Sequence, residues 1–126
     1  MADPTMFSVP GGVEAAAVAR RAVGALDGEV PAALRDDVLL LLTELVTNAV
    51  RHGGVGPDGS LDVTFERRPR CVRVQVVEPG IGFSPGPLSV RDELGGWGLL
   101  LVDQIADRWG VSPAPAGTCV WFELQH

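Results

Sequence analysis

The chain has 126 residues, which suits one domain with a single core. Its formal net charge is −6 and it contains no lysine, so the concentrated positive charge that nucleic-acid binding requires is missing. Its longest apolar run, Val38 to Leu42, is too short to cross a bilayer, and Met1–Thr5 does not begin a signal peptide. We therefore expect a cytoplasmic protein without a nucleic-acid or membrane partner.

Hydrophobic spacing and turn residues predict the order strand, helix, helix, two strands, helix, two strands. The expected ranges are a strand at 5–9, helices at 13–26 and 31–52, strands at 61–66 and 71–78, a helix at 98–106, and strands at 108–112 and 118–124. The apolar side of the first helix is expected to consist of Val13, Ala17, Val18, Ala22 and Leu26. Pro31 suits the first turn of the second helix.

Runs of adjacent strands point to a mixed, mostly antiparallel sheet with helices on one face. The expected fold class is therefore an α/β two-layer sandwich. No repeat or linker divides the chain, so residues 1–126 are expected to form one domain. Cys71 and Cys119 lack the spacing of a zinc site, and each lies in a β-like run where a small buried hydrophobe is expected.

The second predicted helix combines a broad apolar face with a polar stripe. At about 100° per residue, its leucines and valines gather on one side, while Glu44, Asn48, Arg51 and His52 fall opposite. Glu44 and Asn48 are one turn apart, so a carboxylate lies beside a carboxamide. Such a pair offers a base and a neutral oxygen ligand for a hard cation. On this stretch alone, a solvated helix face is the simpler interpretation.

Two glycine clusters frame the loop that follows the predicted strand at 71–78. The first, Glu78–Phe83, ends a strand in a carboxylate and contains Gly80 and Gly82, which permit a sharp turn and close approach to a ligand. The second, Gly95–Leu99, precedes a helix whose N-terminal amides favour an anion. Neither cluster has the lysine of a phosphate-binding P-loop or the full GxGxxG of a dinucleotide site. Each alone is weak evidence.

Four segments resemble, in this order, the N, G1, G2 and G3 boxes of the GHKL ATPases. They are the polar helix, the strand-end acid with its GxGF, the glycine-rich helix start and the late Gly117-Thr118. This ATP-binding (Bergerat) fold includes histidine kinases and type II topoisomerases. Glu44–His52, Gly95–Val102 and Ala106–Gly110 are most similar to the anti-sigma-factor serine/threonine kinases of actinobacterial type. The resemblance extends from about Phe7 to Leu124.

The resemblance implies a role for each matching residue. Asn48 would ligate Mg²⁺ on the ATP phosphates, and Glu44 would be the general base toward a substrate hydroxyl or a water. Arg51 is a candidate for the phosphate side. The residues expected around the nucleotide are Glu78, Gly80 and Gly82 at the adenine, Gly96, Trp97, Gly98 and Leu99 at the phosphates, and Thr118 near the base. Residues 84–94 would form a lid.

Two positions depart from the family pattern. The first-box acid is usually Asp, whereas this chain has Glu78, which can still accept a hydrogen bond from the adenine amino group but is one methylene longer. Trp97 stands where close relatives often have a charged or small residue. An indole there would cover the nucleotide, face a partner or pack on the lid.

The leading hypothesis is an ATP- and Mg²⁺-binding kinase that phosphorylates a serine of a small anti-anti-sigma-like antagonist and also sequesters a sigma factor. The alternative is a degenerate GHKL module that acts by protein contact alone, which Glu78 in place of Asp favours. The catalytic domain of a two-component histidine kinase fits less well, because the chain has no room for dimerisation helices and neither His52 nor His126 suits a phosphoacceptor. A homodimer is left open.

Overall fold

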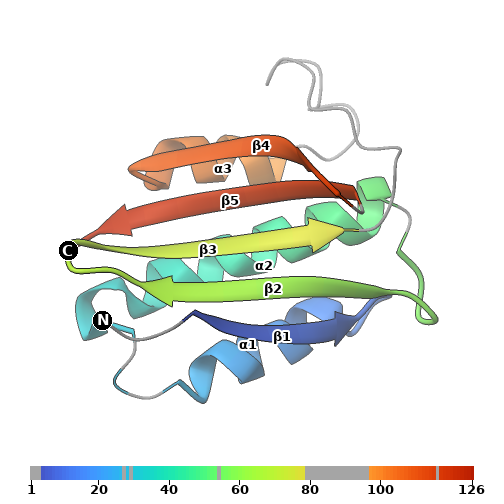
Figure 1. Ribbon diagram of the computed structural model, residues 1–126, viewed down its shortest axis with the longest axis horizontal. Coiled ribbons are helices and arrows are strands. Elements are labelled where there is room, and N and C mark those ends of the chain that lie inside the picture. Colours follow the sequence, from blue (N-terminus) through green and yellow to red (C-terminus); the bar gives the residue numbers. More distant parts are fainter. Residues whose placement is uncertain (1–3, 27, 29, 54, 79–96, 116) are drawn as a thin grey trace.

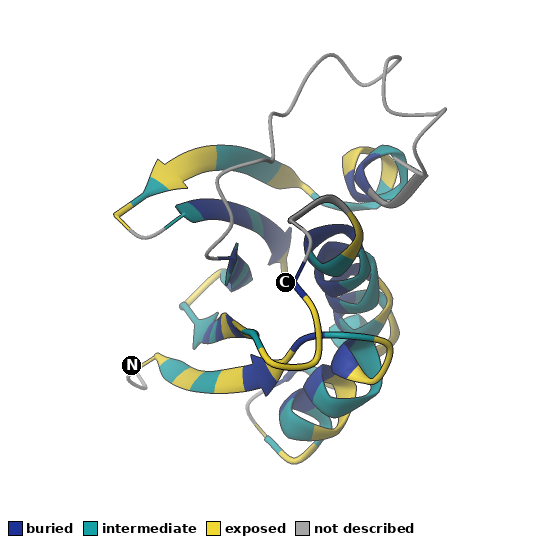
Figure 2. Ribbon diagram, turned by 90° about the vertical axis from the view of Figure 1, so that its right-hand side faces the viewer, coloured by how far each residue is buried: buried dark blue, intermediate teal, exposed yellow. Residues whose placement is uncertain are grey.

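The computed structural model describes residues 4–26, 28, 30–53, 55–78, 97–115 and 117–126. Its elements are β1 (Thr5–Pro10), α1 (Ala15–Gly24), a 3-10 turn η1 (Ala32–Leu34), α2 (Arg35–Gly53), β2 (Ser60–Arg67), β3 (Cys71–Glu78), α3 (Trp97–Ile105), β4 (Arg108–Ala114) and β5 (Gly117–Gln125). The strands form one sheet in the order β1-β2-β3-β5-β4. Figure 1 and Figure 2 show the helices packed on one face of this sheet. The predicted α/β two-layer sandwich is confirmed.

The described strand pairings are all antiparallel. Between β2 and β3 the Arg68 amide donates to the Cys71 carbonyl over 2.8 Å, which closes the predicted turn. Along β3 the side chains alternate as expected. Val72, Val74 and Val76 are buried, whereas Arg73 and Gln75 are half-exposed on the open face of the sheet.

Helix α2 fastens the helical layer to the sheet. Its predicted apolar face is confirmed, since Leu42, Leu45, Val46 and Ala49 are buried in the core. Each buried leucine or valine stabilises the fold by about 1.5–3 kcal/mol, so the rotation of this helix is firmly set. No helix within the described ranges is long and apolar enough to span a bilayer.

The prediction for α1 was wrong in two respects. The helix begins at Ala15 rather than at Val13, which is 98% exposed, and it ends before Leu26. Its fully buried positions are Ala15, Ala19 and Val23. An alanine-rich segment offers small residues on several sides, so spacing alone does not select the face that packs against a neighbour. Similarly, Pro31 precedes the 3-10 turn in an extended conformation instead of opening α2.

Candidate functional site

Helix α2 carries Asn48 into the interior. This side chain is only 6% exposed, although the sequence pattern placed it on a polar stripe. The described residues of this stripe differ in exposure: Glu44 is half-buried, Asn48 is buried and Arg51 is exposed. Asn48 and Arg51 are about 60° apart around the axis, so they face different neighbours. Of these two side chains, Asn48 lies where α2 meets the sheet and α3.

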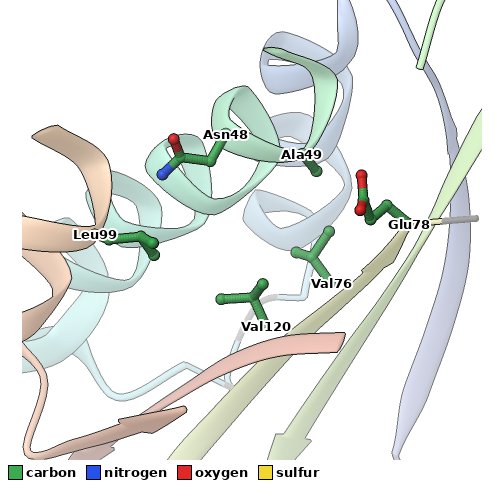
Figure 3. A pocket seen from close by; sticks show the side chains of 6 residues that line it. All are labelled: Asn48, Ala49, Val76, Glu78, Leu99 and Val120. Carbon is green, nitrogen blue, oxygen red and sulfur yellow. The ribbon is translucent and has the colours of Figure 1, made fainter. Parts of the chain in front are cut away.

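Asn48 lines a small pocket together with its neighbour Ala49 and residues of β3, α3 and β5. Within the described chain, the pocket is lined by Asn48, Ala49, Val76, Glu78, Leu99 and Val120. Figure 3 shows the Asn48 carboxamide on α2 and the Glu78 carboxyl group at the end of β3, with Ala49 between them in this view. The other walls are apolar. The pocket therefore has two polar groups at separate places on a hydrophobic lining, as small-molecule sites commonly do.

The Asn48 amide nitrogen is buried and has no hydrogen-bond partner among the described residues. Leaving a buried polar group unpaired costs about 1–3 kcal/mol, and most such groups in folded proteins are paired. Asn is also a weaker helix former than the leucines around it. Among the described residues nothing satisfies this donor, so the position suits an acceptor on a ligand.

Glu78 is the second unpaired group. It occupies the inward position that follows Val76 in the alternation of β3, and it is 2% exposed. Neither carboxyl oxygen has a hydrogen-bond partner in the described part of the chain. Burial removes water from the carboxylate and raises the pKa of Glu78 above its ordinary value. A buried acid without a cation is costly to ionise, so this group is also suited to a ligand.

Thr118 lies beside Glu78 in the sheet. The two residues are directly paired across β3 and β5, and Thr118 is 9% exposed. Side chains paired in this way stand about 4.5–5.5 Å apart at Cβ. The structure therefore places the predicted hydroxyl of Thr118 next to the predicted base-recognising acid. Val76 and Val120, one inward position further along the same two strands, are paired in the same register.

Of the other predicted side chains, one lines this pocket and two do not. Leu99 on α3 is 1% exposed and forms part of the pocket wall. Glu44 is half-buried one helical turn before Asn48, but it does not line the pocket. Arg51 is exposed and lines a separate hollow between α1 and α2, together with Thr47 and Val50. The structure thus brings together Asn48, Glu78, Thr118 and Leu99, and leaves Arg51 apart.

The glycine predictions fall mostly outside the described residues. Gly80, Gly82 and Gly96 lie there, as does the predicted lid at 84–94. Trp97 and Gly98 are the first residues of α3, and their side-chain surroundings are likewise outside the description. These roles stay predictions.

Three pocket residues were not among the predicted site residues. Ala49, Val76 and Val120 line the pocket. Their position could have been found from the alternation of β3, since Val76 shares the inward face with Glu78 two residues later. Ala49 directly follows Asn48, and its small side chain takes up little of the pocket on the α2 side.

Comparison with known protein families matches residues 9–124 to the family described as histidine kinase-like ATPase domain. The match spans almost the whole chain and includes every element that forms the pocket. Among curated proteins, none matches the chain.

Proposed function

Because the chain belongs to the histidine kinase-like ATPase domain family, we propose that it binds ATP with Mg²⁺ and transfers the γ-phosphoryl group to a serine of a small antagonist protein. Nucleotide binding follows from the family. The kinase reaction, the magnesium ion, the antagonist and a sigma factor as a second partner are proposals, supported by the resemblance of Glu44–His52 and Gly95–Val102 to the anti-sigma-factor serine/threonine kinases.

The observation that carries the proposal is the buried, unpaired Asn48 on the wall of the pocket that also holds Glu78. The two groups fit the two ends of a nucleotide. An acid deep between apolar walls suits a heteroaromatic base, and a carboxamide on the adjoining helix suits the phosphates and their metal. The unpaired amide nitrogen of Asn48 is a donor, which suits a phosphate oxygen. When bound, Mg²⁺ would neutralise charge on the phosphates, and the carbonyl oxygen of Asn48 would be the protein atom that holds it.

Glu44 is proposed to act as the base. It lies one turn from Asn48 along α2 and is half-buried, so it borders the place where the phosphates would lie and remains open to a protein substrate. Its carboxylate would take the proton of the serine hydroxyl. The serine oxygen then bonds to the γ-phosphorus, the bond from that phosphorus to the bridging oxygen breaks, and ADP leaves.

The kinase proposal is tested by incubating the protein with γ-labelled ATP and a candidate antagonist protein. Phosphoserine should form with the wild type and fall by about 10²–10⁴-fold in Glu44→Gln, as expected for loss of a general base. Glu14→Gln is the matched control, because Glu14 is an exposed glutamate that precedes α1. Its rate should equal that of the wild type.

The second candidate, a non-catalytic nucleotide-binding module, is favoured by the extra methylene of Glu78 at the base position. Titration with Mg-ATP, followed by tryptophan fluorescence with Trp97→Phe as control, separates the two functions. Saturable binding without Glu44-dependent phosphoserine would support the non-catalytic module and contradict the kinase. Loss of phosphoserine in both glutamate variants would remove Glu44 from the role of base.

A further inference from the structure

We propose that Glu78 holds the adenine ring as a neutral carboxyl group, which donates a hydrogen bond to ring nitrogen N1 and accepts one from the 6-amino group. The inference rests on the proposed nucleotide binding and specifies how this chain reads the base. A neutral carboxyl group can donate one hydrogen bond and accept another, whereas an ionised carboxylate can only accept.

The first support is the position of the two oxygens. Glu78 is 2% exposed at the pocket end of β3, and both of its oxygens lack partners among the described residues. Water is therefore largely excluded from both. A neutral carboxyl group has one O–H donor and one carbonyl acceptor, so a ligand that satisfies it must present an acceptor beside a donor.

The second support is the absence of charge around Glu78 in the described part of the chain. The groups that line its pocket are Asn48 and Ala49 from α2, Val76 from β3, Leu99 from α3 and Val120 from β5. Thr118, its partner across β5, is also uncharged. None of these side chains titrates near neutral pH, and Asn48 is not hydrogen-bonded to Glu78. An ionised Glu78 would be a buried charge with no counter-ion among the described residues, and its raised pKa has burial as its cause.

The third support is the fit of the adenine edge. Its Watson–Crick edge offers an acceptor at N1 directly beside the donor amino group, which is the pattern that a neutral carboxyl group satisfies with two parallel bonds. An ionised carboxylate would satisfy only the amino group and would set an oxygen lone pair against the lone pair of N1. In a pocket with apolar walls, that mismatch is not relieved by water.

The test is calorimetric titration of ATP and of 1-deaza-ATP, which has C–H in place of N1, into the wild type and Glu78→Gln. Gln has the same shape and offers an N–H donor and a C=O acceptor, but it has no proton to lose. Measuring both proteins between about pH 5 and 9 cancels the titration of the phosphates, since only Glu78 differs. Circular dichroism confirms that the variant is folded.

The proposal gives two expected results. The affinity of the wild type for ATP, relative to that of Glu78→Gln, falls as the pH rises, because the proton needed for the donor is lost. It approaches about tenfold per pH unit once Glu78 ionises in the free protein. In both proteins 1-deaza-ATP binds about tenfold more weakly than ATP, because one buried hydrogen bond is missing.

The opposite results separate this inference from the proposed function. If ATP binds but the ratio rises with pH, or if 1-deaza-ATP binds as tightly as ATP, Glu78 acts as an ionised acceptor and the inference is wrong while nucleotide binding stands. If neither protein binds ATP at any pH, the proposed function fails and the inference fails with it. As a second measurement, the ¹³C carboxyl signal of Glu78 in the complex, assigned by its loss in Glu78→Gln, should keep the shift of a neutral acid at pH 7; the shift of a carboxylate would overturn the inference.

Discussion

Two buried glutamates on neighbouring strands have opposite surroundings. Glu78 ends β3 on the helix side of the sheet, and Glu123 lies in β5 on the open side, paired across the strands with Arg73 and Arg108. They are 2% and 6% exposed. Around Glu78 the described residues are uncharged and its oxygens are unpaired, whereas Glu123 is surrounded by arginines.

The partners of Glu123 are supplied by the fold itself. Arg68 and Arg73 donate to its Oε2 atom over 3.2 and 3.0 Å, and Arg108 approaches Oε1 at 3.8 Å. The Arg73 guanidinium also lies 4.1 Å from the centre of the Trp121 ring. Burial of an acid alone therefore does not mark a site. The informative difference is that the arginines satisfy Glu123, whereas both oxygens of Glu78 lack a partner among the described residues.

The largest expected effect follows from removing the charge of the satisfied acid. Glu123→Gln should lower the free energy of unfolding by about 2–3 kcal/mol, because three arginines lose their shared partner. This is below the loss for a fully buried pair, since Arg68 and Arg108 are partly exposed. Urea unfolding measures it. Glu78→Gln is the matched variant, and an equal loss there would remove the contrast between the two acids.

A second perturbation reaches the Glu123 side without touching the pocket. A Cβ at Gly110 would lie 2.9 Å from the Trp121 ring, so Gly110→Ala must displace the indole and weaken its stacking with Arg73. We expect a loss of about 1–2 kcal/mol in thermal unfolding and unchanged nucleotide affinity. Ser112→Ala is the control, because Ser112 is exposed on the same strand. A drop in nucleotide affinity would show that the two sides are coupled.

The pH dependence of stability sharpens the contrast further. The pKa of Glu78 is raised in the folded protein, so its stabilising contribution is complete below the pKa of the unfolded chain and is lost as the pH rises through the folded pKa. Between those values, the wild type should lose up to about 1.4 kcal/mol per pH unit relative to Glu78→Gln. Parallel urea titrations at several pH values measure this difference. A constant difference would mean that Glu78 is not destabilised by its burial.

The smallest expected effect on folding accompanies a large effect on binding. Asn48→Ala removes an unpaired buried amide and adds a better helix former, so stability should change by only about 0.5 kcal/mol in either direction. Nucleotide affinity should fall at least tenfold. A stability loss above about 2 kcal/mol would show that Asn48 is paired in the free protein and belongs to the fold.

Much of this contrast was accessible from the sequence. The strand at 71–78 was predicted, with Glu78 as the acid at its end, and helical spacing predicted the apolar face of α2; the inward position of Glu78 follows from the alternation of that strand. Those patterns depend on one element and one neighbouring layer. These patterns can therefore be read from the sequence without knowledge of the rest of the fold.

What sequence spacing missed depends on the packing of several elements. The polar stripe of α2 was expected to act as one surface, but α3 and the sheet meet it near Asn48 while α1 meets it near Arg51. The packed face of α1 was misassigned, because alanines lie on several of its sides. The arginine cluster on Glu123 was not predicted, because it joins residues 50 and 55 positions apart.

Selective ¹⁵N labelling of Asn48 tests the central claim most directly, because Asn48 is the single asparagine of the sequence and its side-chain amide gives one identifiable pair of signals. Adding Mg-ATP should shift that pair saturably, at one nucleotide per chain, while the side-chain amide of Gln75, on the open face of the sheet and followed in a parallel glutamine-labelled sample, stays in place. Asn48 signals that do not move at saturating Mg-ATP would contradict the assignment of this pocket as the nucleotide site.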